Sequence, residues 1–192
     1  MGNVAGVQVE KDCRFMAMNF PPLQGIGDNT FDSCLSLQVI EHIRDDAGFV
    51  REIFRVLKPG GVAMITTPNR KMSLTRNPWH IREYDPESLA RLVSGIFGNA
   101  EMLGITGNEK VMNYHEENRK SVNSITRFDI LKLQYRLPAA VLKIPYELMN
   151  RLNRNRLKQN HTRLVTDITY EDYLVTDHPG EALDLLCLMR KN

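Results

Sequence analysis

The sequence predicts an α/β fold, in which strands and helices alternate along the chain. A short run of alternating large and small residues at 31–37 has the pattern of a strand, and a second apolar run covers 62–67. Between them, apolar residues recur at helical spacing from Asp46 onward. Strand, helix and strand in this order form a βαβ unit, which is the building block of a parallel sheet.

The middle of this unit is one amphipathic helix. Its apolar positions recur three and four residues apart and so share one buried face; they are Phe49, Val50, Ile53, Phe54 and Leu57. The sequence PGG at 59–61 ends the helix, because proline cannot continue it and glycine tolerates a left-handed turn. Gln38 follows the first strand, and Pro68 and Asn69 follow the second. The carboxyl ends of such strands are where open α/β sheets bind their ligands.

Upstream of the unit, the sequence predicts one more strand at 14–18, which leaves through NFPP at 19–22. The first dozen residues lack a glycine-rich nucleotide-binding turn, because Gly2 and Gly6 do not form the pattern G-x-G-x-x-G.

Downstream of the unit, residues 70–84 carry charges and the single tryptophan without a helical period, which predicts a long loop over the site. A helix then begins at Asp85 and Pro86, which suit the N-cap and the first helical position. Gly98 ends this helix. Strands are expected at 100–105 and, as the last element, at 183–189.

The stretch 108–178 departs from this alternation. Two helical stretches, 130–137 and 141–152, are expected to meet near Pro138 and Pro145. The sequence predicts a helical cap inserted before the last strand, within a single domain that covers 1–192.

The cap carries a local excess of positive over negative charge. Between residues 110 and 163 there are twelve Lys or Arg and four acidic residues, whereas the whole chain has a net charge of +2. The apolar side of its helices is expected to pack on the domain, while the basic side stays in water or meets an anionic group. The apolar residues are Leu133, Leu137, Val141, Leu142 and Leu148. The basic residues are Lys132, Arg136, Lys143 and Arg151.

Composition bounds the class of protein. With 192 residues, 42% hydrophobic and 25% charged, the chain has the composition of a soluble domain. There is no N-terminal signal pattern and no run of about 20 apolar residues that would span a bilayer, so a cytoplasmic location is expected. Cys13, Cys34 and Cys187 are far apart and odd in number, which favours buried free thiols over a disulfide framework.

Three motifs of the βαβ unit carry a family resemblance: QVIEHI at 38–43, LKPGG at 57–61 and TTPN at 66–69. Together they resemble the central segment of class I S-adenosylmethionine-dependent methyltransferases, especially the small-molecule branch that includes ubiquinone-pathway O-methyltransferases. The resemblance extends over 14–106. It implies a Rossmann-like methyltransferase sheet that lacks its first one or two strands and whose last two strands form an antiparallel pair at the sheet edge. It also implies S-adenosyl-L-methionine as cofactor and methyl transfer to a small-molecule acceptor, with oxygen as the expected acceptor atom.

The resemblance also implies cofactor-binding residues. These are Asn19 and Phe20 after one strand, and Leu37 and Gln38 after the next. Asn19 stands where relatives carry the residue that faces the adenine. The glycine turn that would hold the methionine end of the cofactor has no counterpart, so the isolated chain is expected to bind the cofactor weakly.

Methyl transfer requires alignment of the nucleophile with the methyl group and, for a hydroxyl, removal of a proton. Glu41, His42 and, on the following loop, His80 are the expected catalytic residues. Gln38 lies one helical turn before His42. Some relatives bind a divalent cation through Glu-x-x-Glu-His here, but Gln38 replaces one carboxylate, so no metal is expected. A purely structural histidine is the alternative role of His42.

The partners expected from the sequence follow from the basic cap. Arg151, Arg154 and Arg156 suit an anionic small-molecule substrate or an anionic membrane surface, and a solvated helix face is the simpler alternative. Nucleic acid is not expected, because no RNA- or DNA-binding motif accompanies these charges.

Two other functions remain as alternatives to an active enzyme. One is a truncated or degenerate methyltransferase-like domain without independent cofactor binding, acting as a partner or fragment, which the absent glycine turn favours. The other is an NAD-dependent dehydrogenase, which LKPGG and TPN do not support.

Overall fold

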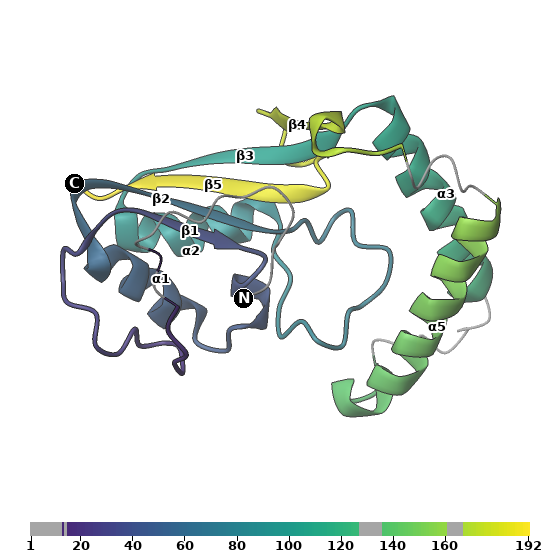
Figure 1. The fold of residues 1–192 in the computed structure, drawn as a ribbon, viewed down its shortest axis with the longest axis horizontal. Coiled ribbons are helices and arrows are strands. Elements are labelled where there is room, and N and C mark those ends of the chain that lie inside the picture. The colour runs from purple at the N-terminus through teal and green to yellow at the C-terminus, as the bar shows by residue number, and fades with distance from the viewer. Residues whose placement is uncertain (1–12, 14, 127–135, 161–166) are drawn as a thin grey trace.

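The computed structural model describes residues 13, 15–126, 136–160 and 167–192. Within this part of the chain, five strands form one sheet in the order β1-β2-β5-β3-β4 (Figure 1). The strands are β1 (Phe31–Leu37), β2 (Leu57–Pro68), β3 (Ala100–Gly107), β4 (Tyr173–Thr176) and β5 (Asp184–Arg190). The helices are α1 (Asp46–Val56), α2 (Pro86–Phe97), α3 (Glu109–Thr126) and α5 (Ala139–Asn160), with short 3-10 helices η1 (Ile40–His42) and η2 (Tyr170–Asp172).

The predicted βαβ unit is confirmed, because β1 and β2 are parallel and α1 connects them. The Asp45 side chain accepts a hydrogen bond from the Gly48 amide at 2.8 Å and so caps the start of α1. The second strand begins earlier than expected, at Leu57. The pairing jumps from Phe31–Leu57 to Ser33–Val62, so the residues around Gly60, whose φ is +79°, bulge out of the ladder.

The next helix is also confirmed, and its local signals explain it. Asp85 accepts a hydrogen bond from the Ser88 amide, while the Ser88 hydroxyl accepts one from the Asp85 amide, and Pro86 is the first helical residue. Gly98 has a φ of +79° and ends the helix.

The last strand lies inside the sheet. β5 is antiparallel to both β2 and β3, as expected for its pairing with β3. The other side of β3 pairs with β4, which forms this edge of the sheet and falls within the stretch expected to be a helical cap. Four residues are too few for an alternating pattern to stand out in the sequence, which is why β4 was not predicted.

The strand expected at 14–18 is a wrong prediction for the residues that the structure describes. Residues 15–18 make no ladder with the sheet, and Phe15 and Met16 are exposed. β1 pairs with β2 on one side, and no described strand lies along its other side. A strand-forming sequence needs such a neighbour to satisfy its backbone groups.

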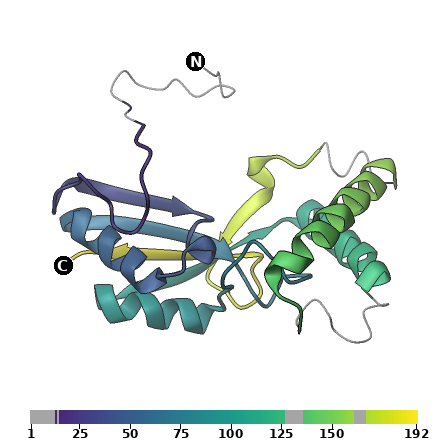
Figure 2. The ribbon, with the colours of Figure 1, turned by 90° about the horizontal axis from the view of Figure 1, so that it is seen from below.

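Both sheet-covering helices, α1 and α2, lie on one face of the sheet (Figures 1 and 2). Their apolar side chains form the core with inward-facing residues of β2 and β5, among them Ile65 and Cys187. On the opposite face, Leu35, Leu37 and Val175 are exposed. In the described part of the chain, the sheet therefore has one covered and one open face.

The helices α3 and α5 stand beyond the end of the sheet at which β1 and β2 finish (Figures 1 and 2). α5 runs through Pro145 as one helix, so no hinge interrupts it there. The expected packing of Val141 and Leu148 on the domain is wrong, because both are exposed. The other expected helical stretch lies almost entirely outside the described residues, as do Lys132, Leu133 and the side chains of Arg154 and Arg156.

The cysteines agree only in part with the expectation of buried thiols. Cys187 is buried, and burial raises its pKa to about 12; Cys34 is partly buried, whereas Cys13 is exposed. No helix in the described ranges has the length and apolar character needed to cross a bilayer.

Candidate active site

The site begins at the carboxyl end of β1, where the chain turns sharply into η1. Gln38 has a φ of +56°, in the left-handed region that non-glycine residues seldom adopt. Its amide donates a hydrogen bond to Thr66 O at 3.0 Å, which fixes the turn against β2. The turn places η1 directly after β1 and in contact with β2.

Glu41 is the buried centre of this region, with only 1% of its surface exposed. Its Oε2 accepts a hydrogen bond from Thr67 Oγ1 at 3.0 Å. Its backbone carbonyl accepts hydrogen bonds from the amides of Ile81 at 2.8 Å and Arg82 at 3.2 Å. One residue thus connects the end of β2 with the loop 70–84.

His42 lies beside this carboxylate, and its Nε2 is 3.8 Å from Glu41 Oε1. Its Nδ1 is 3.0 Å from Trp79 O. Because a carbonyl oxygen only accepts, Nδ1 donates this hydrogen bond, and the neutral ring then carries its lone pair on Nε2. The side chain is 45% exposed, so Nε2 lies within reach of a bound molecule.

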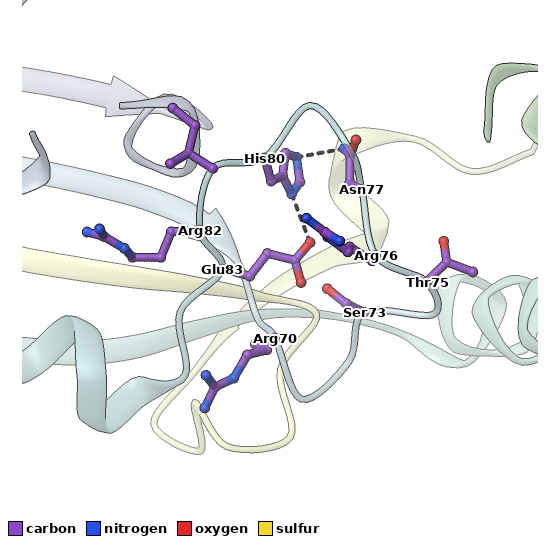
Figure 3. Close-up of a pocket in the computed structure, with 9 residues that line it drawn as sticks. Arg70, Ser73, Thr75, Arg76, Asn77, His80, Arg82 and Glu83 are labelled. Atoms are coloured by element: carbon purple, nitrogen blue, oxygen red, sulfur yellow. Dashed lines mark hydrogen bonds and ion pairs between the residues drawn. The ribbon is translucent and has the colours of Figure 1, made fainter. Parts of the chain in front are cut away.

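His80 packs edge-on against His42, with 5.0 Å between the ring centres. Its Nε2 accepts from Asn77 Nδ2 at 2.8 Å, and its Nδ1 donates to Glu83 Oε1 at 2.9 Å (Figure 3). Burial disfavours the charged form of Glu83, but hydrogen bonds from His80 and Ser73 outweigh it and lower the pKa of this carboxyl. Both ring nitrogens of His80 are therefore engaged within its own loop.

Among the described residues, Glu41, His42 and His80 together offer a geometry that could hold a metal ion. Glu41, His42 and His80 each present one ligand atom, and these atoms lie within 4.8 Å of one another. A cation would have to displace Asn77 or Glu83 from His80, since those bonds occupy both of its nitrogens. The expectation of a metal-free site stays a prediction.

Asp184 also belongs to the site, although the sequence did not indicate it. It begins β5 and pairs in register with Pro68, at the same end of the sheet as Gln38. Burial raises the pKa of the Asp184 carboxyl; a hydrogen bond with Gln38 opposes this rise, and the nearby Glu41 charge adds to it. The one available signal was an acid at the start of the apolar run 185–189.

The loop 70–84 is anchored to α1 as well as to η1. Tyr84 donates a hydrogen bond through its hydroxyl to Asp46 Oδ2 at 2.7 Å, and Arg82 forms an ion pair with the same carboxylate. At the end of β2, the fully buried Asn69 donates to the carbonyls of Pro179 at 3.0 Å and Ala182 at 2.8 Å. Asn69 of the TTPN motif thus has a structural role.

A small cavity of about 260 Å³ opens along this loop (Figure 3). His80, Asn77 and Glu83 line it together with arginines, of which Arg70 pairs with Asp85. The expectation that this loop lies over an active site stays a prediction.

The expected cofactor-binding residues lie in two places. Leu37 and Gln38 are exposed at the end of β1. Asn19 is exposed, and the Phe20 ring packs edge-on against Phe49 of α1 with 4.8 Å between centres. The hydroxyl of Ser36, buried just before Leu37, has no hydrogen-bond partner within the described ranges.

These residue types fit part of S-adenosyl-L-methionine. Leu37 and Phe20 offer apolar surface for a flat ring, while Gln38 and Asn19 offer amide donors and acceptors. The described residues supply no glycine-rich turn for the methionine end. Which of these side chains touch the cofactor stays a prediction.

Part of the chain is similar in sequence to known methyltransferases. Residues 3–65 match the family described as "Methyltransferase domain". A probable S-adenosylmethionine-dependent methyltransferase of Mycolicibacterium smegmatis is 44% identical over 71 residues, which are 34% of this chain and 28% of that protein. A ubiquinone biosynthesis O-methyltransferase of Caulobacter vibrioides is 41% identical over 46 residues, 24% of this chain and 18% of that protein.

The fold has a counterpart among solved structures. A SAM-dependent methyltransferase of Thermotoga maritima superposes with a TM-score of 0.51 at 15% identity, covering 91% of this chain and 60% of that chain. The chain matches only about a third or less of the length of its curated relatives. Residues 3–65 are thus similar in sequence to methyltransferase domains, and the described fold resembles that of a solved SAM-dependent methyltransferase.

Proposed function

We propose that this chain provides the part of an S-adenosylmethionine-dependent methyltransferase that binds the methyl acceptor. The enzyme methylates an oxygen atom of a small molecule, and His42 is the general base. The observation that carries the proposal is the state of the His42 ring. Trp79 O holds the hydrogen on Nδ1, so Nε2 has its lone pair available at a partly exposed position.

The bound cofactor supplies a methyl group on a positively charged sulfur. A hydroxyl acceptor must lose its proton as it attacks this methyl group, and His42 Nε2 takes that proton. The ring then becomes positively charged, 3.8 Å from the buried Glu41 carboxylate. Because Glu41 is almost fully excluded from water, its charge stabilises the imidazolium more strongly than an exposed acid would.

Glu41 also positions the base through the backbone. Its carbonyl holds the amides of Ile81 and Arg82, and the same loop presents Trp79 O to His42. His80, with both nitrogens engaged, acts here as a positioning residue that keeps the loop in this shape.

A base in this position favours oxygen over nitrogen as the acceptor. A neutral amine attacks through its own lone pair and loses its proton afterwards, whereas a hydroxyl is a weak nucleophile until the proton leaves. The similarity to proteins named ubiquinone biosynthesis O-methyltransferase supports the same choice.

A second candidate is a methyltransferase-like domain that does not bind the cofactor by itself. The observation in its favour is the exposure of Leu35 and Leu37 on the open face of β1, at the end of the sheet where the cofactor is expected. With these side chains exposed, a cofactor bound here would contact protein on one side only.

The two candidates are separated by measuring transfer of labelled methyl groups from S-adenosylmethionine, at millimolar concentration, to matched phenol and aniline acceptors. The first predicts transfer to the phenol and a fall in kcat of about 10²- to 10⁴-fold in His42→Gln, with little change in KM for the cofactor. The matched control is His178→Gln, because the His178 side chain is exposed and is not among the residues placed in the site.

An unchanged kcat in His42→Gln would contradict the role of His42. If the chain neither transfers methyl groups nor binds S-adenosylhomocysteine in a calorimetric titration, the second candidate is supported instead.

A further inference from the structure

One side of α5 exposes apolar side chains. Ile144 is 78% exposed, and Val141 and Leu148 are each 56% exposed. Their spacing of three and four residues places them on one side of the helix. On the opposite side Leu142 and Tyr146 are partly buried, so the helix exposes apolar side chains where a surface helix normally presents polar ones.

Positive charge flanks this face. Arg136, just before the helix, and Arg151, near the end of its described side chains, are both exposed. Along its whole sequence α5 contains five Lys or Arg and one acid, Glu147. A positive rim around exposed apolar side chains is the pattern of a helix that lies in a lipid interface.

The loop 70–84 extends the same surface. Trp79 and Ile81 are about half exposed, and Lys143 Nζ sits 3.7 Å from the centre of the Trp79 ring. Trp79, Ile144 and Leu148 line an open cleft of about 610 Å³ between the loop and α5. Tryptophan prefers the boundary between hydrocarbon and water, which suits this position.

We propose that these residues form a membrane-docking surface that binds the surface of an anionic phospholipid bilayer. The surface is defined by Val141, Ile144, Leu148 and Trp79 with the basic residues Arg136 and Arg151. Its apolar side chains enter the interface while the arginines meet lipid phosphates. A second copy of the chain fits less well, because like charges on the two copies would face each other across the contact.

The position of this surface connects it with the proposed function. Trp79 belongs to the docking surface through its ring and holds His42 through its carbonyl oxygen. An acceptor with a lipid tail would therefore reach the proposed base from the bilayer. This last step rests on the proposed function, whereas docking itself does not.

Trp79 is the single tryptophan of the chain, which makes docking directly observable. The 192-residue chain is titrated with vesicles of phosphatidylcholine containing 30% phosphatidylglycerol, and with vesicles of phosphatidylcholine alone. Docking predicts a blue shift of the tryptophan emission and co-sedimentation with the anionic vesicles. Both are expected to weaken at 0.5 M salt, which screens charges beyond a few ångströms.

Two variant sets with matched controls test the surface. Arg136→Gln with Arg151→Gln is expected to lower the partition coefficient about fivefold for each charge removed, and Arg44→Gln with Arg91→Gln is expected to leave it unchanged. Serine at Val141, Ile144 and Leu148 is expected to lower it at least about tenfold. The apolar control places serine at Leu35, Leu174 and Val175, which are at least half exposed on other parts of the molecule.

Three results would overturn the proposal. The first is the absence of any emission shift or co-sedimentation with anionic vesicles. The second is loss of vesicle binding in the apolar control but not in the α5 variant. The third is a dimer in sedimentation analysis that the α5 serine variant dissociates, because the face would then contact a second copy. Circular dichroism of each variant confirms that it is folded.

Discussion

Replacing Thr67 by valine is expected to destabilise the chain through Glu41. The valine has nearly the same shape but removes the hydroxyl that donates to Glu41 Oε2 at 3.0 Å. A hydrogen bond to a charged group contributes about 1.5–3 kcal/mol, and water cannot easily replace this one at a carboxylate that is 1% exposed. We therefore expect a loss of about 2 kcal/mol, or about 4–8 °C in Tm for a chain of this length.

The assay is thermal and urea unfolding of four proteins in a double-mutant cycle: wild type, Thr67→Val, Glu41→Met and the double variant. With Glu41 replaced by methionine, the Thr67 change should cost less than about 0.5 kcal/mol, which leaves a coupling energy of at least about 1 kcal/mol. The matched control is Thr106→Val, whose hydroxyl makes only a long contact of 3.7 Å to Met112 Sδ. Additive losses in the cycle would refute the interpretation that the pair is coupled.

Three further changes give distinct outcomes. Hydrogen bonds from the Thr169 amide, Lys110 and Asn108 lower the pKa of Asp172 from 3.8 to about 2. The carboxylate therefore stabilises the fold above pH 3.8, and this contribution is lost as the pH falls through 2. The unfolding free energy of Asp172→Asn should depend less on pH between 4 and 2 than that of the wild type. Burial raises the pKa of Asp184. Its ionised carboxylate therefore destabilises the fold above that pKa, and the destabilisation disappears below pH 3.8. In paired thermal melts, Asp184→Asn should have a higher Tm than the wild type at pH 8 and the same Tm at pH 3. Asn69→Ala leaves the buried carbonyl of Ala182 and the partly buried carbonyl of Pro179 without their donor, and it should lower the unfolding free energy in urea by about 2–4 kcal/mol. A loss below about 0.5 kcal/mol would contradict the structural role of Asn69.

The elements that the sequence predicted well are those with local signals. The start of α2 is defined by the capping hydrogen bonds between Asp85 and Ser88 and by the fixed backbone angle of Pro86, all within one helical turn. The βαβ unit from Phe31 to Pro68 combines a strand, one amphipathic helix and a glycine turn, so its order follows from adjacent residues. Glu41 and His42 were placed at the strand end for the same reason, and the structure brings them together with His80.

The features that the sequence missed depend on distant contacts. Asp184 joins the site because β5 enters the sheet antiparallel beside β2, which no local pattern of 184–190 specifies. The apolar face of α5 was expected to pack inward, since periodicity gives the spacing of apolar residues but not the direction in which they point. The strand expected at 14–18 had a suitable composition but no neighbouring strand among the described residues.

The most direct test of the central claim is ultraviolet cross-linking of labelled S-adenosyl-L-methionine to the chain, followed by mapping of the labelled peptides by mass spectrometry. Cross-linking captures weak complexes, so it suits a chain that is expected to bind the cofactor weakly. A site at the carboxyl ends of the parallel strands predicts label on peptides that contain Leu37 and Gln38 or Asn19 and Phe20, suppressed by excess S-adenosylhomocysteine. Label confined to 108–178, or label that S-adenosylhomocysteine does not suppress, would contradict it.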